Sequence, residues 1–165
     1  MKVIALYGKA NTGKTSTLNT VVERLKTLGA RIIDTEKNDS NNADRRYIIE
    51  LDDGRRVCIT TAGDYSETQD ANYNFVKVHK PEIWVTASHE KDGSIDSVKK
   101  SFQEGYTDYV IWIRKLYPMM IIQNETIYRY KKDESSLFLE SICNRMNQID
   151  ADRVLNLIFH QTTWF

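Results

Sequence analysis

Apolar residues occur along the chain in runs of strand length and at helical spacing. Residues 3–7 form a short apolar run, and apolar side chains recur at helical spacing over residues 14–28, with Gly29 in the position of a C-cap. The same criteria predict further strands at 31–33, 82–88 and 108–117, and helices at 66–79, 94–104 and 136–159, the last as one long helix or two joined helices. Because strands alternate with helices, the pattern predicts an α/β domain of three layers.

The middle of the chain has a different pattern. A polar stretch, residues 34–44, follows the strand predicted at 31–33. Residues 46–64, "RYIIELDDGRRVCITTAGD", then predict two strands joined at Asp53-Gly54, a dipeptide typical of tight hairpins. We therefore expect one antiparallel hairpin beside a mostly parallel sheet, while residues 120–131 fit either a strand pair or a loop.

Composition excludes several classes of protein. The 165 residues are 41% hydrophobic and 28% charged with a formal net charge of zero, which indicates one ordinary globular domain spanning residues 1–165. A neutral chain has no overall field for nucleic acid, and no apolar run is long enough to span a membrane. Cys58 and Cys143 lack metal-ligand spacing, so we expect free thiols and a cytoplasmic location. The oligomeric state is not predicted.

The segment "GKANTGKTS", Gly8 to Ser16, carries the strongest chemical signal. It matches the pattern G-x-x-x-x-G-K-[ST] and lies between a predicted strand and a predicted amphipathic helix. Gly8 and Gly13 allow backbone angles that point successive N–H groups into one concavity, and the helix that begins at Lys14 adds the positive end of its dipole. We expect Lys14 to reach the β- and γ-phosphates of a nucleotide and the Thr15 hydroxyl to bind Mg²⁺.

This segment resembles the Walker A loop of P-loop NTPases. The resemblance covers residues 2–28, and it implies a parallel sheet with helices on both faces, a nucleoside triphosphate such as ATP, and Mg²⁺. It also implies that the whole loop contacts the phosphates, through these residues: Gly8, Lys9, Ala10, Asn11, Thr12, Gly13, Lys14, Thr15 and Ser16.

A second, partial resemblance lies in the predicted hairpin. The run "IELDDGRRVCITTAG" is similar to the hairpin and D-T-A-G turn of Ras-like small GTPases, but Thr60 stands in place of the aspartate and Asp64 in place of the catalytic glutamine. We expect Asp64 to bind Mg²⁺ through water or to orient the nucleophile, and the Gly63 N–H to contact the γ-phosphate. The alternative is that Asp64 caps the helix predicted at 66–79, with Glu67 completing a capping box.

Other candidates follow predicted strands. Asp34, with Glu36, follows residues 31–33 at the place where small P-loop kinases often carry an acid that binds the acceptor hydroxyl. Ser88 and His89 come at the end of the strand 82–88, at the same edge of the sheet. Arg114 ends another strand, where it would stack on a base, neutralise phosphate charge or form a surface ion pair.

These features together predict a Mg-ATP-dependent P-loop protein, with Lys14, Asp64 and Asp34 as catalytic residues and a small-molecule acceptor in a kinase-like phosphotransferase. Two alternatives remain open: a GTPase-like switch whose polar segment 34–46 senses the nucleotide, and a nucleotide-binding protein with little activity. The chain lacks the guanine-recognition motif N-K-x-D. We therefore expect ATP to bind at least as well as GTP.

Overall fold

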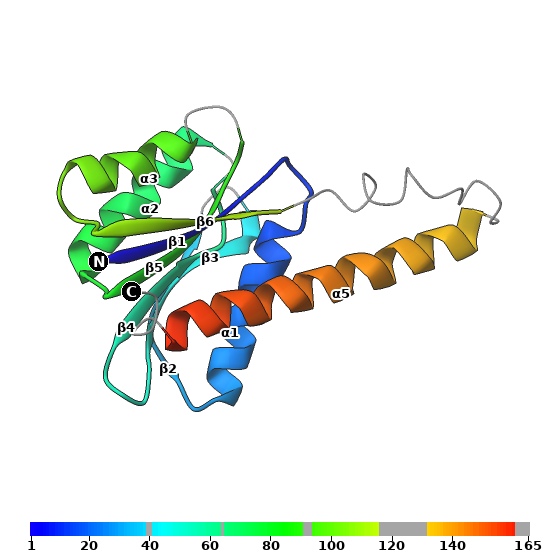
Figure 1. Cartoon of the computed structure of the whole chain (residues 1–165), viewed down its shortest axis with the longest axis horizontal. Coiled ribbons are helices and arrows are strands. Elements are labelled where there is room, and N and C mark those ends of the chain that lie inside the picture. Colours follow the sequence, from blue (N-terminus) through cyan, green and yellow to red (C-terminus); the bar gives the residue numbers. More distant parts are fainter. Residues whose placement is uncertain (39–40, 64, 91–93, 116–131, 161–165) are drawn as a thin grey trace.

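Six strands form one sheet in the computed structural model, which describes residues 1–38, 41–63, 65–90, 94–115 and 132–160 (Figure 1). The strands are β1 (Lys2–Tyr7), β2 (Arg31–Asn38), β3 (Asn41–Glu50), β4 (Arg56–Thr60), β5 (Ile83–Ser88) and β6 (Tyr109–Arg114). Their order across the sheet is β2-β3-β4-β5-β1-β6. The strands β4, β5, β1 and β6 run parallel, whereas β3 is antiparallel to both β2 and β4. The expected α/β fold with a mostly parallel sheet is confirmed.

Helices cover both faces of this sheet (Figure 1). One face carries α1 (Lys14–Thr27) and α5 (Lys132–Phe159), and the other carries α2 (Ser66–His79) and α3 (Ser94–Gln103). Alternation along β1 explains the two layers, because Ile4 and Leu6 pack with α1 and α5 while Val3 and Ala5 pack on the opposite face. The C-terminal segment is one continuous helix of 28 residues.

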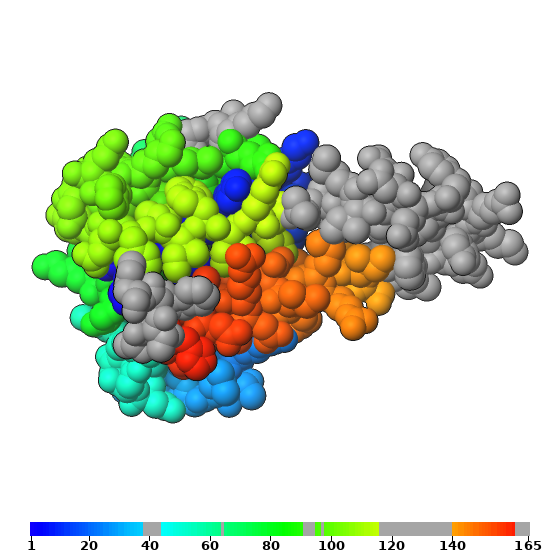
Figure 2. Space-filling view, viewed as in Figure 1, coloured from blue at the N-terminus to red at the C-terminus, as the bar shows by residue number. Residues whose placement is uncertain are grey.

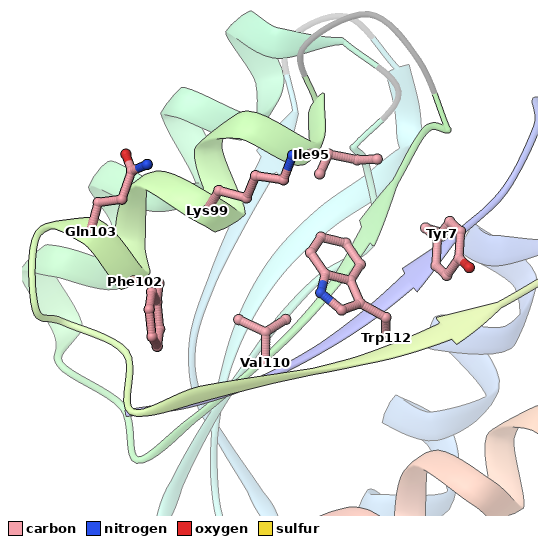
Figure 3. A pocket seen from close by; sticks show the side chains of 7 residues that line it. All are labelled: Tyr7, Ile95, Lys99, Phe102, Gln103, Val110 and Trp112. Carbon is pink, nitrogen blue, oxygen red and sulfur yellow. The ribbon is translucent and has the colours of Figure 1, made fainter.

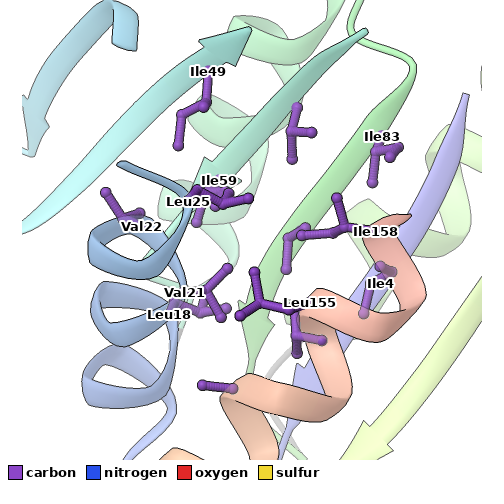
Figure 4. Packing of buried hydrophobic residues seen from close by; sticks show 14 of the residues in the cluster. Ile4, Leu18, Val21, Val22, Leu25, Ile49, Ile59, Ile83, Leu155 and Ile158 are labelled. Carbon is purple, nitrogen blue, oxygen red and sulfur yellow. The ribbon is translucent and has the colours of Figure 1, made fainter. Parts of the chain in front are cut away.

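The larger hydrophobic core lies between the sheet and the pair α1 and α5 (Figure 4). Leu18 and Leu25 of α1 and Val154 and Ile158 of α5 are all buried there. The orange and red atoms of α5 form a continuous band on the face shown in Figure 2. Within the described residues, no helix combines the length and the apolar character needed to cross a membrane.

The hairpin at Asp53-Gly54 is confirmed, with Gly54 at φ +83° and its N–H donating to the Leu51 carbonyl at 2.9 Å. The strand predicted at 31–33 was too short, because β2 continues through Asn38 and pairs with β3. An edge strand has only one neighbour, and exposed side chains leave it without an apolar pattern. Backbone pairing with β3 therefore forms a strand that the sequence pattern did not indicate. The segment 120–131 lies outside the described residues.

Candidate functional site

The loop of residues 8–13, called the glycine loop below, lies at the carboxyl edge of the parallel strands. It joins β1 to α1, and β1 lies between β5 and β6 in the sheet. The Gly8 N–H donates to the Ser88 carbonyl at 3.2 Å, and the Lys115 N–H donates to the Tyr7 carbonyl at 2.7 Å. The ends of both neighbouring strands therefore hold the start of the loop. Ligands of open α/β sheets bind at this edge.

The backbone of the glycine loop turns through two left-handed residues, Asn11 at φ +59° and Gly13 at φ +83°. The Thr12 hydroxyl donates to the Lys9 carbonyl at 2.9 Å, which closes the loop on itself. Lys9, Ala10 and Asn11 are exposed, whereas Gly8 and Thr12 are buried. The loop is thus anchored at both ends and presents its middle to solvent.

The first turn of α1 is electropositive. Lys14 is only 5% exposed, and its ammonium donates to the carbonyls of Gly8 at 3.0 Å and Lys9 at 2.9 Å. The first turn contains no acidic residue, and no described side chain caps the helix, whose N-cap is Gly13. Its amide groups, the helix dipole and the ammonium can therefore act together on an anion. Ser16, in the same turn, is exposed.

Three oxygen atoms from separate elements meet beside this turn. The Thr15 hydroxyl donates to the Thr61 carbonyl at 3.1 Å and lies 3.4 Å from a carboxylate oxygen of Asp44, on β3. An octahedral Mg²⁺ with ligands at about 2.0–2.1 Å has neighbouring oxygen atoms about 2.9 Å apart. The Thr15 hydroxyl oxygen lies 3.1 Å and 3.4 Å from the other two oxygen atoms, somewhat farther than two ligands of one Mg²⁺ would lie from each other.

Asp44 is a site residue that no motif in the sequence indicated. The register of the hairpin contained the signal, because Arg46 pairs with Thr60 and the Arg45 N–H donates to the Thr61 hydroxyl at 2.9 Å. Asp44 lies two residues before Arg46, so pairing outward from the turn at Gly54 places it beyond the end of β4. There its carboxylate lies beside Thr15 of α1. Within the described residues, no three His, Cys, Asp or Glu side chains group as a metal site. Mg²⁺ often uses only one or two carboxylates and completes its shell with phosphates.

Thr60, which replaces the aspartate of the GTPase pattern, has partners inside the sheet. It is fully buried, donates to the Thr86 hydroxyl at 2.8 Å and accepts from the indole N–H of Trp84 at 3.1 Å. Gly63 is buried against β5, since a Cβ there would overlap the Ala87 carbonyl. Asp64 lies outside the described residues. Its expected roles, as metal ligand, catalytic acid or helix cap, therefore stay predictions.

Asp34 lies away from the glycine loop. It sits within β2, at the level of Ile48, Cys58, Trp84 and Val3, and β2 is separated from β1 by three strands. At about 4.8 Å per strand, this separation is roughly 19 Å across the sheet. Its carboxylate lies 3.3 Å from His79. The expectation that Asp34 stands at a strand end is wrong, because β2 continues for four more residues, to Asn38.

Arg114 ends β6 level with Tyr7, the residue before the glycine loop. Its guanidinium forms an ion pair with Glu90 at 3.2 Å, which is the surface pairing considered for it. Ser88 ends β5 on the other side of Tyr7, and its hydroxyl donates to the His89 carbonyl at 3.4 Å. The structure therefore brings Arg114 and Ser88 to the loop edge.

An apolar pocket of about 660 Å³ opens between β6 and α3, starting beside Tyr7 (Figure 3). The rings of Tyr7 and Trp112 meet edge to face, with their centroids 5.8 Å apart. The residues that line it are Tyr7, Ile95, Lys99, Phe102, Gln103, Val110 and Trp112. Apolar walls with one cationic side chain suit a small organic molecule.

The loop edge therefore offers amide groups and a buried ammonium to an anion, and three oxygen atoms to a cation. The groups for an anion all come from adjacent residues, 8–16, whereas the three oxygen atoms come from α1, β3 and the segment after β4, far apart in the sequence. Comparisons of the chain with protein-family models, with curated proteins and with solved structures find no match.

Proposed function

We propose that this chain is a P-loop protein that binds a Mg²⁺-bound nucleoside triphosphate and acts on its γ-phosphoryl group. The observation that carries the proposal is the position of Lys14, whose ammonium lies on the carbonyls of Gly8 and Lys9 at the first turn of α1. A cation, the first-turn amides of a helix and a left-handed glycine at one helix start suit a chain of phosphates. ATP, or another nucleoside triphosphate, is the proposed ligand.

The metal would be held by Thr15 and Asp44, with the Thr61 carbonyl beside them. When bound, Mg²⁺ would neutralise charge on the phosphates. Asp44 supplies the carboxylate near Thr15 that Thr60, standing in place of the usual aspartate, cannot supply. Asp64 remains a proposed second acid, either for the metal or for orienting the attacking group.

Two reactions fit this site, each with its own support. A kinase-like phosphotransferase needs room for an acceptor, and the pocket beside Tyr7 and Trp112 provides an apolar space next to the loop. A hydrolytic switch needs a segment that senses the metal and phosphate, and Asp44 belongs to the polar segment 34–46 considered for that role. Comparing ATP consumption with and without candidate small acceptors distinguishes the two reactions.

The same proposal includes a cytoplasmic location, which is consistent with two cysteines that are not paired, Cys58 and Cys143. It also includes ATP binding at least as strong as GTP binding.

A thermal-shift panel tests the proposal. Wild-type protein is melted with ATP, GTP, ADP and nucleoside monophosphates, each with and without Mg²⁺. A nucleotide at a hundred times its Kd stabilises by about 2.7 kcal/mol, which for a chain of this size raises Tm by about 5–11 °C. We expect the largest shift with Mg-ATP. No shift with any nucleotide contradicts the proposal.

Two matched variants test the metal ligand. Asp44→Asn should lose the extra shift that Mg²⁺ gives, because the carboxylate near Thr15 is gone, while keeping the shift given by ATP alone. Asp34→Asn removes the same charge from the distant edge strand and should keep both. An unchanged Mg²⁺ increment in Asp44→Asn excludes Asp44 as a ligand.

A further inference from the structure

One polar pair touches both glycines of the glycine loop. A Cβ on Gly8 would lie 2.7 Å from the Lys115 carbonyl oxygen and 3.2 Å from the Lys115 Cβ. A Cβ on Gly13 would lie 3.0 Å from Nδ2 and 3.1 Å from Cγ of Asn147, and closer still to its Oδ1. Lys115 follows β6, and Asn147 lies on α5. The two ends of the loop are therefore packed against residues remote from it in sequence.

Hydrogen bonds join this pair to each other and to α1. The Lys115 ammonium donates to Asn147 Oδ1 at 3.0 Å, to the Thr17 hydroxyl at 3.0 Å and to the Asp150 carboxylate at 2.6 Å. The Thr17 hydroxyl also donates to Asn147 Oδ1, at 3.2 Å. The Lys115 side chain is 1% exposed, so this cation depends on its partners in the network.

Apolar contacts also attach α5 to the domain. Ala151, Val154, Leu155 and Ile158 of α5 are buried against α1 and the sheet, one to three turns away from Asn147 (Figure 4). A buried ion pair adds little net stability, because desolvation of its charges offsets their attraction. The polar network lies at the loop end of this apolar interface, where its geometry can fix the loop.

We propose that Asn147 is a positioning residue for phosphate binding: it fixes Gly13 and the first turn of α1, and thereby links nucleotide binding to the docking of α5. This inference rests on the proposed function, but the positioning itself concerns only the protein. Asn147 reaches the loop by packing on Gly13 and by accepting from Thr17, one turn into α1. By linkage, a nucleotide that needs the fixed loop also favours the docked α5.

Amide hydrogen exchange and nucleotide affinity are measured on three variants. Asn147→Ala removes the packing and both hydrogen bonds to Oδ1. Asn147→Asp keeps the shape and the accepting oxygen. Gln148→Ala is the control, because Gln148 is an exposed neighbour on α5 whose side chain accepts from Arg24, near the far end of α1 from the loop.

In protein without nucleotide, the Thr17 amide, which donates to the Gly13 carbonyl at 2.9 Å, should exchange about tenfold faster in Asn147→Ala than in wild type, since two hydrogen bonds and the packing are lost. Asn147→Asp and Gln148→Ala should exchange like wild type. The Kd for Mg-ATP should rise about tenfold in Asn147→Ala and stay within about twofold in Gln148→Ala. Nucleotide should also slow exchange along 147–158 in wild type but not in Asn147→Ala.

Unchanged exchange of the Thr17 amide in Asn147→Ala overturns the positioning role, whatever the affinity. Faster exchange with an unchanged Kd overturns the link to nucleotide binding. If Asn147→Ala does not fold, faster exchange of the Thr17 amide in Asn147→Asp, which keeps the accepting oxygen, overturns the role instead. If wild type binds neither Mg-ATP nor Mg-GTP, the proposed function fails, and the exchange of the Thr17 amide still decides the positioning role.

Discussion

Two glycines with the same backbone conformation allow the packing of the glycine loop to be measured without a ligand. Gly13 and Gly54 both have φ +83°, a left-handed angle that is unfavourable for alanine. A Cβ on Gly54 meets nothing within 4 Å, whereas a Cβ on Gly13 overlaps the side chain of Asn147. Comparing Gly13→Ala with Gly54→Ala therefore isolates the contact between the loop and α5.

The expected magnitudes follow from these two situations. The left-handed angle costs alanine about 1–2 kcal/mol at either position. Overlap in a packed region adds about 1–3 kcal/mol, so Gly13→Ala should lose about 2–5 kcal/mol of unfolding free energy in total. Asn147→Ala removes the three overlapping atoms. In that background, Gly13→Ala should cost only about 1–2 kcal/mol, the same as Gly54→Ala.

Urea unfolding of wild type, both single glycine variants, Asn147→Ala and the double variant provides the measurement. The m-values must agree for the free energies to be compared. Equal losses for Gly13→Ala and Gly54→Ala, or no coupling between Gly13→Ala and Asn147→Ala, would refute the packing of α5 on the loop.

Two further predictions concern buried groups of the sheet. Thr60→Val should lower the unfolding free energy by about 1–3 kcal/mol, because Trp84 loses its acceptor, while Mg-ATP affinity stays as in wild type; a loss of affinity without a loss of stability gives Thr60 a direct role in the site. Burial raises the pKa of the Cys58 thiol well above its ordinary value, so at pH 8 a thiol reagent should modify Cys143 first and Cys58 only after unfolding. Rapid reaction of native Cys143→Ser protein contradicts this order.

The fold followed from the sequence wherever burial imposes a pattern. The buried strands β1 and β5, the two helices predicted at 66–79 and 94–104, and the turn at Gly54 all lie where apolar spacing and turn residues predicted them, within one or two residues. The edge strand β2 was mostly missed because its side chains are exposed and its pairing comes from the backbone of β3. Periodicity carries no signal for such a strand.

The candidate site was predictable only in its local part. The glycine loop, Lys14 and Thr15 are adjacent in sequence, so their spacing alone indicated an anion site. Asp44 and Asn147 reach the loop only through hairpin register and helix packing, which single-residue patterns do not encode. The prediction of Asp34 as a site residue assumed that a strand ends just before it. Because β2 continues to Asn38, Asp34 lies within the strand and not at its end.

Calorimetric titration of Mg-ATP into wild type, Lys14→Ala and Lys9→Ala tests the central claim most directly. Lys9 belongs to the same loop and carries the same charge, but its side chain is exposed, whereas the ammonium of Lys14 lies on the loop carbonyls. A charge-assisted hydrogen bond contributes about 1.5–3 kcal/mol, so Lys14→Ala should weaken binding by about 10- to 150-fold, and a weak site would fall below detection. Lys9→Ala should bind within about threefold of wild type. If Lys14→Ala binds Mg-ATP as wild type does, or if wild type binds none, this loop is not a nucleotide site.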